Sequence, residues 1–563
     1  MRVARGEGVV AQTETDHMGM PRLLDRPRVT PQDATTRRYD IAAAALCVAV
    51  LILALAVGHL HQVGGFGVET DFYGIYAVQA ENLMAGRAYT YLNHPPGYPF
   101  LLATASVVAR DLFMASKIIS AIATAFFGWF TYLTFKGLFN PQIALATTML
   151  LLPATFQYSF LVASDIVGAV MIALALWGLL RTPRLTMGTC LLAGLFAGAA
   201  YLVRSNALFV AVGVVFSLLV FDPDRESMRD RLARAGLFAF AALLAASPWL
   251  VMNWRTNGSP LASAAYLQVA THVYMPDLNA ELSAALRERI ESPAAAISRL
   301  QVAADFNSFV DVVSHDPPVF LRKYLGSVVS YAGRLAVEGL QFPAYVVGPI
   351  GLVLMLGDLS RRRLTYLVAC LFGYLPLALV GFHERYYLFL LPVGFLLVAY
   401  AIFRTMPGEY RLFNLRVPVR WLALLIIAAF LSASAYREVS NAIAAEPRYL
   451  FEIAEFLRNR SSPGDIIIGR KPHLAYLAGL KDTFPFVHTA EAYLTKARER
   501  RARYVVYSAY EAWQWPGLRS LQDPSALPSG LKLIYHHRPS RTLIYEVDTG
   551  PWALNPGRAR KDN

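Results

Sequence analysis

Isolated charged residues in apolar surroundings are the feature of this sequence that could do chemistry. Two carboxylates stand out, Asp71 in ETDFYG and Asp165 in VASDIVG, because each lies beside a long apolar run. Three arginines, Arg204, Arg255 and Arg385, occupy similar settings. Guanidinium groups pair with phosphate oxygens, and a carboxylate can take the proton from an attacking hydroxyl. Together these residue types suit group transfer from a phosphate-linked donor.

Further polar residues close to these positions suit contacts with a substrate. We take the following as candidates for substrate binding: His94, Asn206, His383, Glu384 and Tyr386. The two carboxylates have a second role open to them, because a pair of Asp side chains can also hold a divalent metal ion. Asp71 and Asp165 are therefore candidates for catalysis or for a metal site, and the arginines are candidates for the donor phosphate.

Each of these residues also has a purely structural interpretation. Arg204 and Arg255 could extend to lipid headgroups, and Tyr386 could belong to an interfacial aromatic belt. Asp71, Asp165 and His94 could each begin or cap a helix. The functional interpretation depends on whether these residues meet on one side of one cavity, which is decided by the elements that carry them.

The composition places these elements in a membrane. The chain has 563 residues, of which 56% are hydrophobic and 16% are charged, against about 25% charged in soluble domains. This excludes an ordinary soluble enzyme and a disordered chain. The net charge of +13 is spread over loops, as expected for membrane topology rather than for nucleic acid. The three cysteines lie in apolar runs without metal-binding or disulfide spacing.

Eleven apolar segments approach the roughly 20 residues that a bilayer requires. They are 41–61, 114–137, 143–162, 165–181, 186–203, 207–221, 235–252, 343–358, 364–382, 386–404 and 420–437. The arginine-rich loops then fall on the same side as residues 1–40, which we interpret as a cytoplasmic tail. The apolar run 97–109 is too short to span, and we predict an interfacial or re-entrant helix there.

This topology divides the chain into a cytoplasmic tail (1–40), a transmembrane domain (41–437) and an extracytoplasmic domain (438–563). The predicted outer loops are 62–113 and 253–342, the latter with helical periodicity at 279–291 and 316–336. In the C-terminal domain, EPRYLFEIAEFLRNR predicts a helix. Strands are predicted at 465–469, 503–508, 531–536 and 542–547. The predicted fold is thus a polytopic α-helical membrane protein with a small C-terminal α/β domain.

All the candidate site residues fall on the extracytoplasmic side in this topology. Neither GxxxxGK[ST] nor GxGxxG after a strand occurs in the sequence, so no nucleotide site is predicted. A donor carried by the membrane fits an outward-facing site better than a nucleotide sugar.

The order of several short motifs over residues 40–440 resembles the polytopic GT-C glycosyltransferases. It is similar in particular to the bacterial polyprenyl-phosphate-sugar enzymes related to protein O-mannosyltransferases and lipid A aminoarabinose transferases. The motifs are Thr70–Tyr73, Pro95–Pro99, Ser164-Asp165, Arg204–Asn206, Pro248–Pro260 and Glu384–Pro392.

The resemblance implies an inverting hexosyl or pentosyl transfer from a polyprenyl-phosphate sugar, with Asp71 as the general base or its positioning partner. Some relatives have a metal near the site and others need none. The mannosyltransferases have an adjacent Asp-Glu pair, whereas here Thr70 precedes a single Asp, so protein mannosylation is not implied. The implied acceptor is a glycan, a lipid or a protein, and the implied location is the inner membrane of a bacterium.

Two other classes of function compete with the enzyme. A transporter or flippase of lipid-linked sugars would place ionisable residues near the middle of its spans, but here the centres of the spans are nearly free of charge. A scaffold anchored by the membrane region would not need eleven spans. We therefore expect an enzyme.

Overall fold

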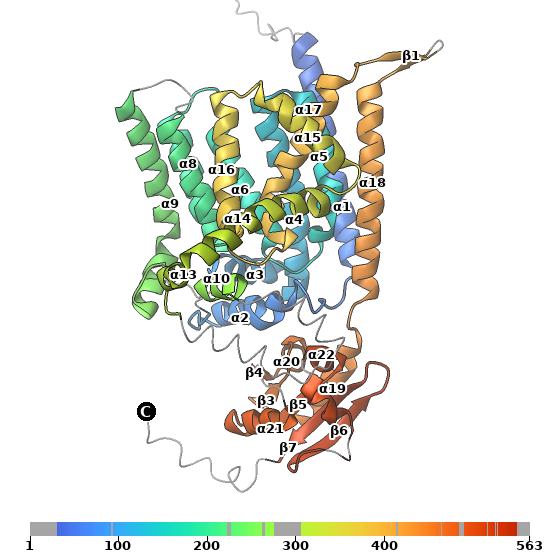
Figure 1. Ribbon diagram of the computed structural model, residues 1–563. Helices are drawn as coiled ribbons and strands as arrows, with labels where there is room; N and C mark the ends of the chain where they lie inside the picture. The colour runs from blue at the N-terminus through green and yellow to red at the C-terminus, as the bar shows by residue number, and fades with distance from the viewer. Residues whose placement is uncertain are drawn as a thin grey trace, which may run out of the picture.

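The computed structural model describes residues 31–91, 94–221, 227–261, 265–274, 306–412, 415–462, 464–483, 489–514, 516–523, 525 and 527–548. A bundle of helices forms the larger part, and a small domain with a β-sheet lies beyond one end of it (Figure 1). The β1–β2 hairpin (Tyr410–Leu412 and Leu415–Val417) lies at the opposite end of the bundle. The predicted combination of a helical membrane domain and a C-terminal α/β domain is confirmed.

Helices occupy each of the eleven predicted segments. They are α1 (Pro31–Gly58), α4 (Leu112–Leu138), α5 (Pro141–Thr155), α6 (Asp165–Leu180), α7 (Met187–Val203), α8 (Ala207–Val220), α9 (Met228–Asn257), α15 (Ala344–Leu356), α16 (Arg361–Leu377), α17 (Leu391–Thr405) and α18 (Val419–Ala444). Within the described residues, five helices are long and apolar enough to cross a membrane, and five shorter ones are apolar.

Several of these helices differ in length from the prediction, and for α5 and α9 the reasons are local. Helix α5 ends at Thr155 rather than 162, with Pro153 in its last turn, and the short 3₁₀ helix η2 (Phe156–Ser159) follows. Helix α9 is longer than predicted. The side chain of Ser227 accepts a hydrogen bond from Asp230 N at its start, and Gly258 ends it with a φ of 73°.

Helices α7 and α9 approach each other closely through small residues. A Cβ added at Gly194 would lie 2.3 Å from Phe238 O, and one at Gly198 would lie 2.2 Å from Ala242 O. Only glycine permits this backbone contact, which is typical of helix pairs in membranes. The contact fixes α7, and therefore the turn at its C-terminal end that carries Arg204.

The predicted outer loops form short helices around one end of the bundle. The first contains the π-helical turn η1 (Phe72–Tyr76), α2 (Ala77–Met84) and α3 (Gly97–Ala109). Helix α3 has the bounds predicted for the short apolar segment. Helices α2 and α3 lie at the end that faces the C-terminal domain (Figure 1).

The second predicted outer loop also contains helices. It forms α10 (Ala265–Tyr274), α13 (Phe309–His315), α14 (Pro317–Arg334) and the π-helical turn η3 (Leu335–Leu340). Helix α14 confirms the periodicity at 316–336 and crosses the bundle obliquely (Figure 1). Asp316 and Pro317 explain where it begins, because Asp316 caps the helix and proline suits its first position. The predicted helix at 279–291 lies outside the described residues.

The C-terminal domain is a five-stranded sheet with helices on both faces. Its strands are β3 (Ile466–Ile468), β4 (Lys481–Thr483), β5 (Tyr504–Tyr507), β6 (Leu531–His537) and β7 (Thr542–Val547), in the order β4-β3-β5-β7-β6. Its helices are α19 (Tyr449–Arg460), α20 (His473–Ala478), α21 (Ala490–Glu499), α22 (Ala509–Gln514) and the 3₁₀ helix η5 (Pro516–Gln522). The four predicted strands are present, while β4 was not predicted.

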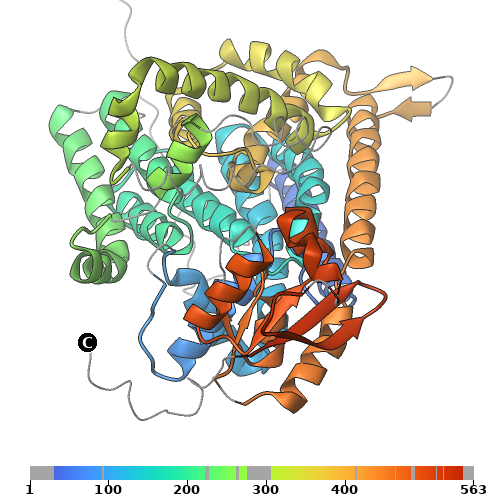
Figure 2. The same ribbon diagram turned by 60° about the horizontal axis from the view of Figure 1, so that its bottom comes forward.

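Alternation along the central strand β5 supplies both hydrophobic cores of this domain. Tyr504 and Val506 pack with α19 and α20, whereas Val505 and Tyr507 pack with α21 and η5. Successive side chains of a strand point to opposite faces. The sheet is therefore covered on both sides, and it stands over the end of the bundle beside α2 (Figure 2).

Candidate active site

The turn between α7 and α8 brings Arg204 to the first residue of α6. Its Nη1 lies 2.7 Å from Asp165 Oδ1 and donates to Ser164 Oγ at 3.1 Å. The Asp165 side chain is 2% exposed. Asp165 lies in the first turn of α6, and Arg204 is the C-cap of α7. Both positions suit the helix dipoles. Ser164 occupies the N-cap of α6 without a side-chain cap, so the capping role considered for Asp165 is not realised.

Gly168 makes room for the Arg204 side chain. A Cβ added to Gly168 would lie 2.6 Å from Arg204 Cδ and 2.9 Å from Cγ. The aliphatic part of Arg204 therefore lies directly over the first turn of α6. The absence of a side chain at this position lets the guanidinium reach Asp165.

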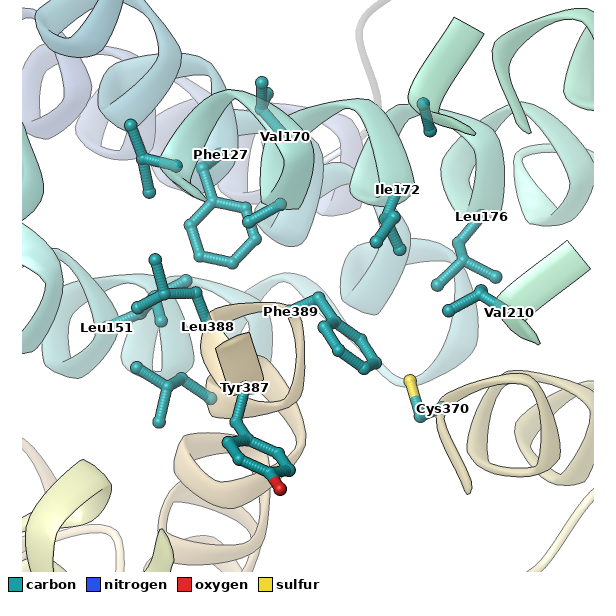
Figure 3. Packing of buried hydrophobic residues seen from close by; sticks show 14 of the residues in the cluster. Phe127, Leu151, Val170, Ile172, Leu176, Val210, Cys370, Tyr387, Leu388 and Phe389 are labelled. Atoms are coloured by element: carbon teal, nitrogen blue, oxygen red, sulfur yellow. The ribbon is translucent and has the colours of Figure 1, made fainter. Parts of the chain in front are cut away.

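The 3₁₀ helix η4 (Glu384–Leu390) supplies a second guanidinium. Arg385 Nη1 lies 3.8 Å from Asp165 Oδ2. The next turn of η4 is buried in the bundle core, where Tyr387, Leu388 and Phe389 are 0%, 2% and 4% exposed. Figure 3 shows these three side chains among residues of α4, α5, α6, α8 and α16. This packing anchors η4 and so holds Arg385 at the site.

Tyr386 lies against both guanidinium groups. Its ring centroid is 5.2 Å from Arg204 Cζ and 5.0 Å from Arg385 Cζ. Cations are attracted to an aromatic face at such distances. The ring therefore helps to hold two like charges close together, which would otherwise repel each other.

Asp71 lies at the start of η1, on the loop that Arg385 also contacts. Arg385 Nη1 donates to Val68 O at 3.3 Å, three residues before Asp71. Arg385 interacts electrostatically with both Asp165 and Asp71. The Asp71 carboxylate is half-buried and makes no capping hydrogen bond to η1. It is thus a carboxylate beside the arginine cluster that is not used to begin a helix.

A small pocket lies where these elements meet. Its polar lining is Asp165, Arg204, Asn206, Arg385 and Tyr386. The volume is about 10 Å³, roughly that of one water molecule. The side chains around it must therefore move before a sugar phosphate can enter.

The remaining predicted residues contact other parts of the structure. The His94 ring lies against Tyr76, with centroids 6.0 Å apart, and Tyr76 Oη is 3.1 Å from Ser164 Oγ. Pro96, rather than His94, is the N-cap of α3. Glu384 faces η2, where it accepts a hydrogen bond from Tyr158 Oη at 2.8 Å. His383 is exposed.

Arg255 is separate from the cluster. It lies in the last turn of α9 with an exposed side chain, and it does not line the pocket. Its neighbours have structural roles. Asn253 is buried and donates to Pro260 O at 3.1 Å, and the Trp249 ring contacts the ring of Tyr89 at 6.1 Å. This motif ties α9 to the first outer loop.

Comparison with known proteins bears on both the fold and the central part of the site. Residues 93–252 match the family model described as dolichyl-phosphate-mannose-protein mannosyltransferase. That range contains Asp165, Arg204 and Asn206, but not Asp71 or Arg385. The search of curated proteins found no match for the chain.

Two solved structures share the architecture at low sequence identity. ArnT from Cupriavidus metallidurans in the apo state is 12% identical with a TM-score of 0.56, over 89% of this chain and 97% of that one. The archaeal oligosaccharyltransferase AglB from Archaeoglobus fulgidus, in complex with an inhibitory peptide and a dolichol-phosphate, is 14% identical with a TM-score of 0.53, over 91% and 75%. The chain has the GT-C fold. The site described above therefore lies in a polytopic GT-C bundle.

A buried charge network close to this candidate site was not predicted from the sequence. His61 Nε2 lies 2.8 Å from Glu69 Oε1, and His61 Nδ1 lies 2.7 Å from Glu446 Oε1. Glu69 also accepts hydrogen bonds from Gly65 N at 2.7 Å and Val162 N at 2.9 Å. One carboxylate thus joins the loop that carries Asp71 to the segment that leads into Asp165.

The charges of this network depend on one another. Burial by itself lowers the pKa of His61, but the hydrogen bonds and charges of Glu69 and Glu446 outweigh it and leave that pKa raised. Burial opposes the ionisation of Glu69, yet His61 and the two backbone donors leave the pKa of Glu69 lowered. His61 and Glu69 thus each favour the charged form of the other. The position of Glu69, two residues before Asp71, was the one signal in the sequence that could have pointed to this network.

A divalent metal does not fit the residues present around Asp165. Both of its carboxylate oxygens face guanidinium groups, at 2.7 and 3.8 Å. In the part of the chain that the structure describes, no three His, Cys, Asp or Glu side chains are grouped so that they could hold a metal ion. The alternative in which Asp71 and Asp165 share a metal therefore has no support from the geometry.

Proposed function

We propose that this protein is a membrane glycosyltransferase that moves a hexosyl or pentosyl group from a polyprenyl-phosphate donor to an acceptor hydroxyl. One observation carries the proposal. Two guanidinium groups meet at one buried carboxylate, and a second carboxylate, Asp71, lies within electrostatic range of the same Arg385. This provides a cationic site for phosphate beside a candidate base.

The two arginines have different roles in this proposal. Arg204 is held by Asp165 at 2.7 Å, whereas the contact between Arg385 and Asp165 is longer, at 3.8 Å. A donor phosphate can displace that longer contact and form charge-assisted hydrogen bonds with Arg385. Asp165 then orients Arg204 as the second phosphate ligand.

The transfer itself needs one base and one stabilised leaving group. Asp71 takes the proton of the acceptor hydroxyl while the oxygen of that hydroxyl attacks the anomeric carbon of the donor sugar. The bond between that carbon and the phosphate oxygen breaks, and its electron pair leaves with the phosphate, where Arg204 and Arg385 stabilise the new charge. Attack opposite the leaving group inverts the anomeric centre. We assign contacts with the sugar to the half-buried His94 and Asn206.

The related proteins support the class of donor. The matching family is described by a dolichyl-phosphate-linked sugar, and the AglB structure contains a dolichol-phosphate. For the present chain we propose a polyprenyl-phosphate sugar as donor and a glycan, lipid or protein as acceptor. We further propose eleven spans in the inner membrane of a bacterium, with residues 1–40 in the cytoplasm and residues 438–563 outside.

The test is a transfer assay with purified protein in nanodiscs and a panel of radiolabelled polyprenyl-phosphate sugars. Wild type is expected to release label from one donor, and Asp71→Asn to lose at least about 100-fold of that rate. Asp111→Asn is the matched control. Asp111 is an exposed acidic residue of the same loop that caps α4, and asparagine caps equally well.

Three outcomes would contradict the proposal. Retained turnover by Asp71→Asn would remove Asp71 from the role of base. A product with the donor's anomeric configuration would exclude inversion. Movement of an unreacted donor across proteoliposomes, with no transfer in any assay, would show transport instead.

A further inference from the structure

The C-terminal domain contacts the loop that carries Asp71 through several side chains. We call the contacting residues the clasp and define them as Lys471, His473 and Tyr476, from the β3–α20 connection and α20. Figure 2 shows this domain beside the start of the chain's first outer loop. The clasp residues are separated from Asp71 by about 400 positions in sequence, and the contact exists only in the folded protein.

Lys471 makes the polar part of the clasp. Its Nζ donates to Thr70 Oγ1 at 2.9 Å and to Phe66 O. Thr70 is the residue immediately before Asp71, and its own hydroxyl donates to Phe66 O at 2.9 Å. A single ammonium therefore joins both ends of the turn from Phe66 to Thr70.

Aromatic and apolar contacts make the rest of the clasp. The His473 ring lies on the ring of Tyr73 with centroids 4.2 Å apart, and His473 Nε2 is 3.2 Å from Gly65 O. Tyr476 contacts the rings of Phe72 and Tyr73. These contacts lie on both sides of Asp71 along the chain, so the loop is held before and after its carboxylate.

The positive charge of Lys471 also acts on Asp71. Lys471 interacts electrostatically with Asp71, Glu511 and Arg470, and its Nζ is 4.9 Å from the centroid of the Tyr510 ring. Burial and the neighbouring Arg470 lower the pKa of Lys471 to about 8, while Asp71 and Glu511 act in the opposite direction. Lys471 is thus cationic at neutral pH and loses its charge at moderately alkaline pH.

We infer that Lys471 is a positioning residue that the C-terminal domain supplies to the transferase site. It holds the turn at Thr70 so that the Asp71 carboxylate stays beside Arg385. The inference rests on the proposed role of Asp71 as base. In this inference the C-terminal domain contributes a residue to the site of transfer.

The first experiment compares pH profiles of transfer for the full-length protein in nanodiscs. Lys471→Met is expected to lower kcat by about 10- to 100-fold, since a displaced catalytic group costs about that much, with the donor KM within about twofold. Lys471→Arg keeps the charge, because guanidinium stays protonated throughout. It should retain activity. The alkaline fall in activity, which we expect near pH 8 in wild type from the pKa of Lys471, should move upward by at least one pH unit in this variant. Lys481→Met, an exposed lysine on β4, is the control.

A second measurement needs no substrate and separates this inference from the proposed function. Hydrogen exchange of residues 64–76 is expected to become faster in Lys471→Met than in wild type or Lys481→Met, while exchange in β5 stays unchanged. If no donor is turned over by the wild type, the proposed function fails, and this measurement alone decides whether Lys471 holds the loop.

Three results would overturn the inference. The first is a wild-type kcat and pH profile in Lys471→Met. The second is an alkaline fall that is the same in Lys471→Arg as in wild type. The third is unchanged exchange of residues 64–76 in Lys471→Met.

Discussion

Gly168 offers a test of the site in which no charged or catalytic group is removed. It lies one turn after Asp165 on α6, where the Arg204 side chain crosses the helix. In Gly168→Ala, the new Cβ would lie 2.6 Å from Arg204 Cδ. The change is small and leaves every ionisable group in place, so a loss of activity greater than that of a control variant on the same helix must come from the position of Arg204.

The expected effect can be worked out from these distances. Ordinary contact with a Cβ begins near 3.4 Å, so Arg204 Cδ must move from 2.6 to about 3.4 Å, a displacement of about 0.8 Å. The ion pair with Asp165, now 2.7 Å long, would lengthen by a similar amount. Since a misplacement of about 1 Å can cost about 100-fold in rate, kcat/KM should fall by about 10- to 100-fold.

The stability of the protein should change much less than its activity. Alanine is favoured over glycine inside a helix by about 1 kcal/mol, which offsets part of the cost of stretching the ion pair. We therefore expect a change in Tm of a few degrees at most. The measurements are initial transfer rates over a range of donor concentrations and thermal unfolding of the same preparations.

A matched control exists on the same helix. In Gly178→Ala the nearest atom to the new Cβ is Phe196 Cδ2 at 3.5 Å, which is ordinary contact. This variant should keep wild-type activity. Wild-type kcat/KM in a folded Gly168→Ala protein would refute the placement of Arg204, and equal losses in both variants would show that α6 tolerates no added methyl group.

Two further predictions follow from the buried groups beside the site. Glu69→Gln leaves His61 with one carboxylate, Glu446, instead of two, and it should lower stability by about 1–3 kcal/mol, the usual cost of weakening a buried hydrogen-bonded pair. Because the pKa of His61 is raised, this residue stabilises the fold fully below its pKa in the unfolded chain, and that stabilisation is lost as pH rises through its pKa in the folded protein. Because the pKa of Glu69 is lowered, its stabilisation is lost in acid, as pH falls through its pKa in the folded protein. Thermal unfolding should therefore show the largest difference from wild type between these limits, around pH 5–6, and a difference independent of pH would contradict the network. For His473, burial lowers the pKa to about 4. Below the ordinary pKa of histidine, this side chain therefore binds a proton in the unfolded chain but not in the folded protein. The wild type should accordingly lose about 3 kcal/mol of folding stability between about pH 6.5 and 4. His473→Gln should lack this acid loss, and identical Tm profiles for variant and wild type would count against it.

Local pattern in the sequence determined most of the elements of this protein. The helix α3 has the bounds of its apolar segment, and β7 has the bounds of its predicted strand. Both follow from hydropathy and periodicity, which depend on neighbours in the chain. Strand β4, with the sequence KDT, was not predicted because a three-residue polar strand has no such pattern. It exists because β3 offers it a parallel edge.

The sequence also indicated Asp71, Asp165, Arg204 and Arg385 as candidate site residues, since charges beside apolar runs stand out without any structure. It could not separate them from Arg255, which has the same setting in sequence but is exposed in the structure. What distinguishes Arg204 is a glycine on another helix, and what distinguishes Arg385 is the buried turn that follows it.

The contacts that complete the site were decided by the tertiary structure alone. His61 meets Glu446 across 385 positions, and Lys471 meets Thr70 across 401. Hydropathy and periodicity describe how a segment partitions between water, membrane and core, and they contain no information about which distant segment it will face. The sequence therefore determined the class of the fold and the kinds of side chain available for chemistry. Which of those side chains share one pocket, and which domain holds them there, was decided when the helices and the sheet packed.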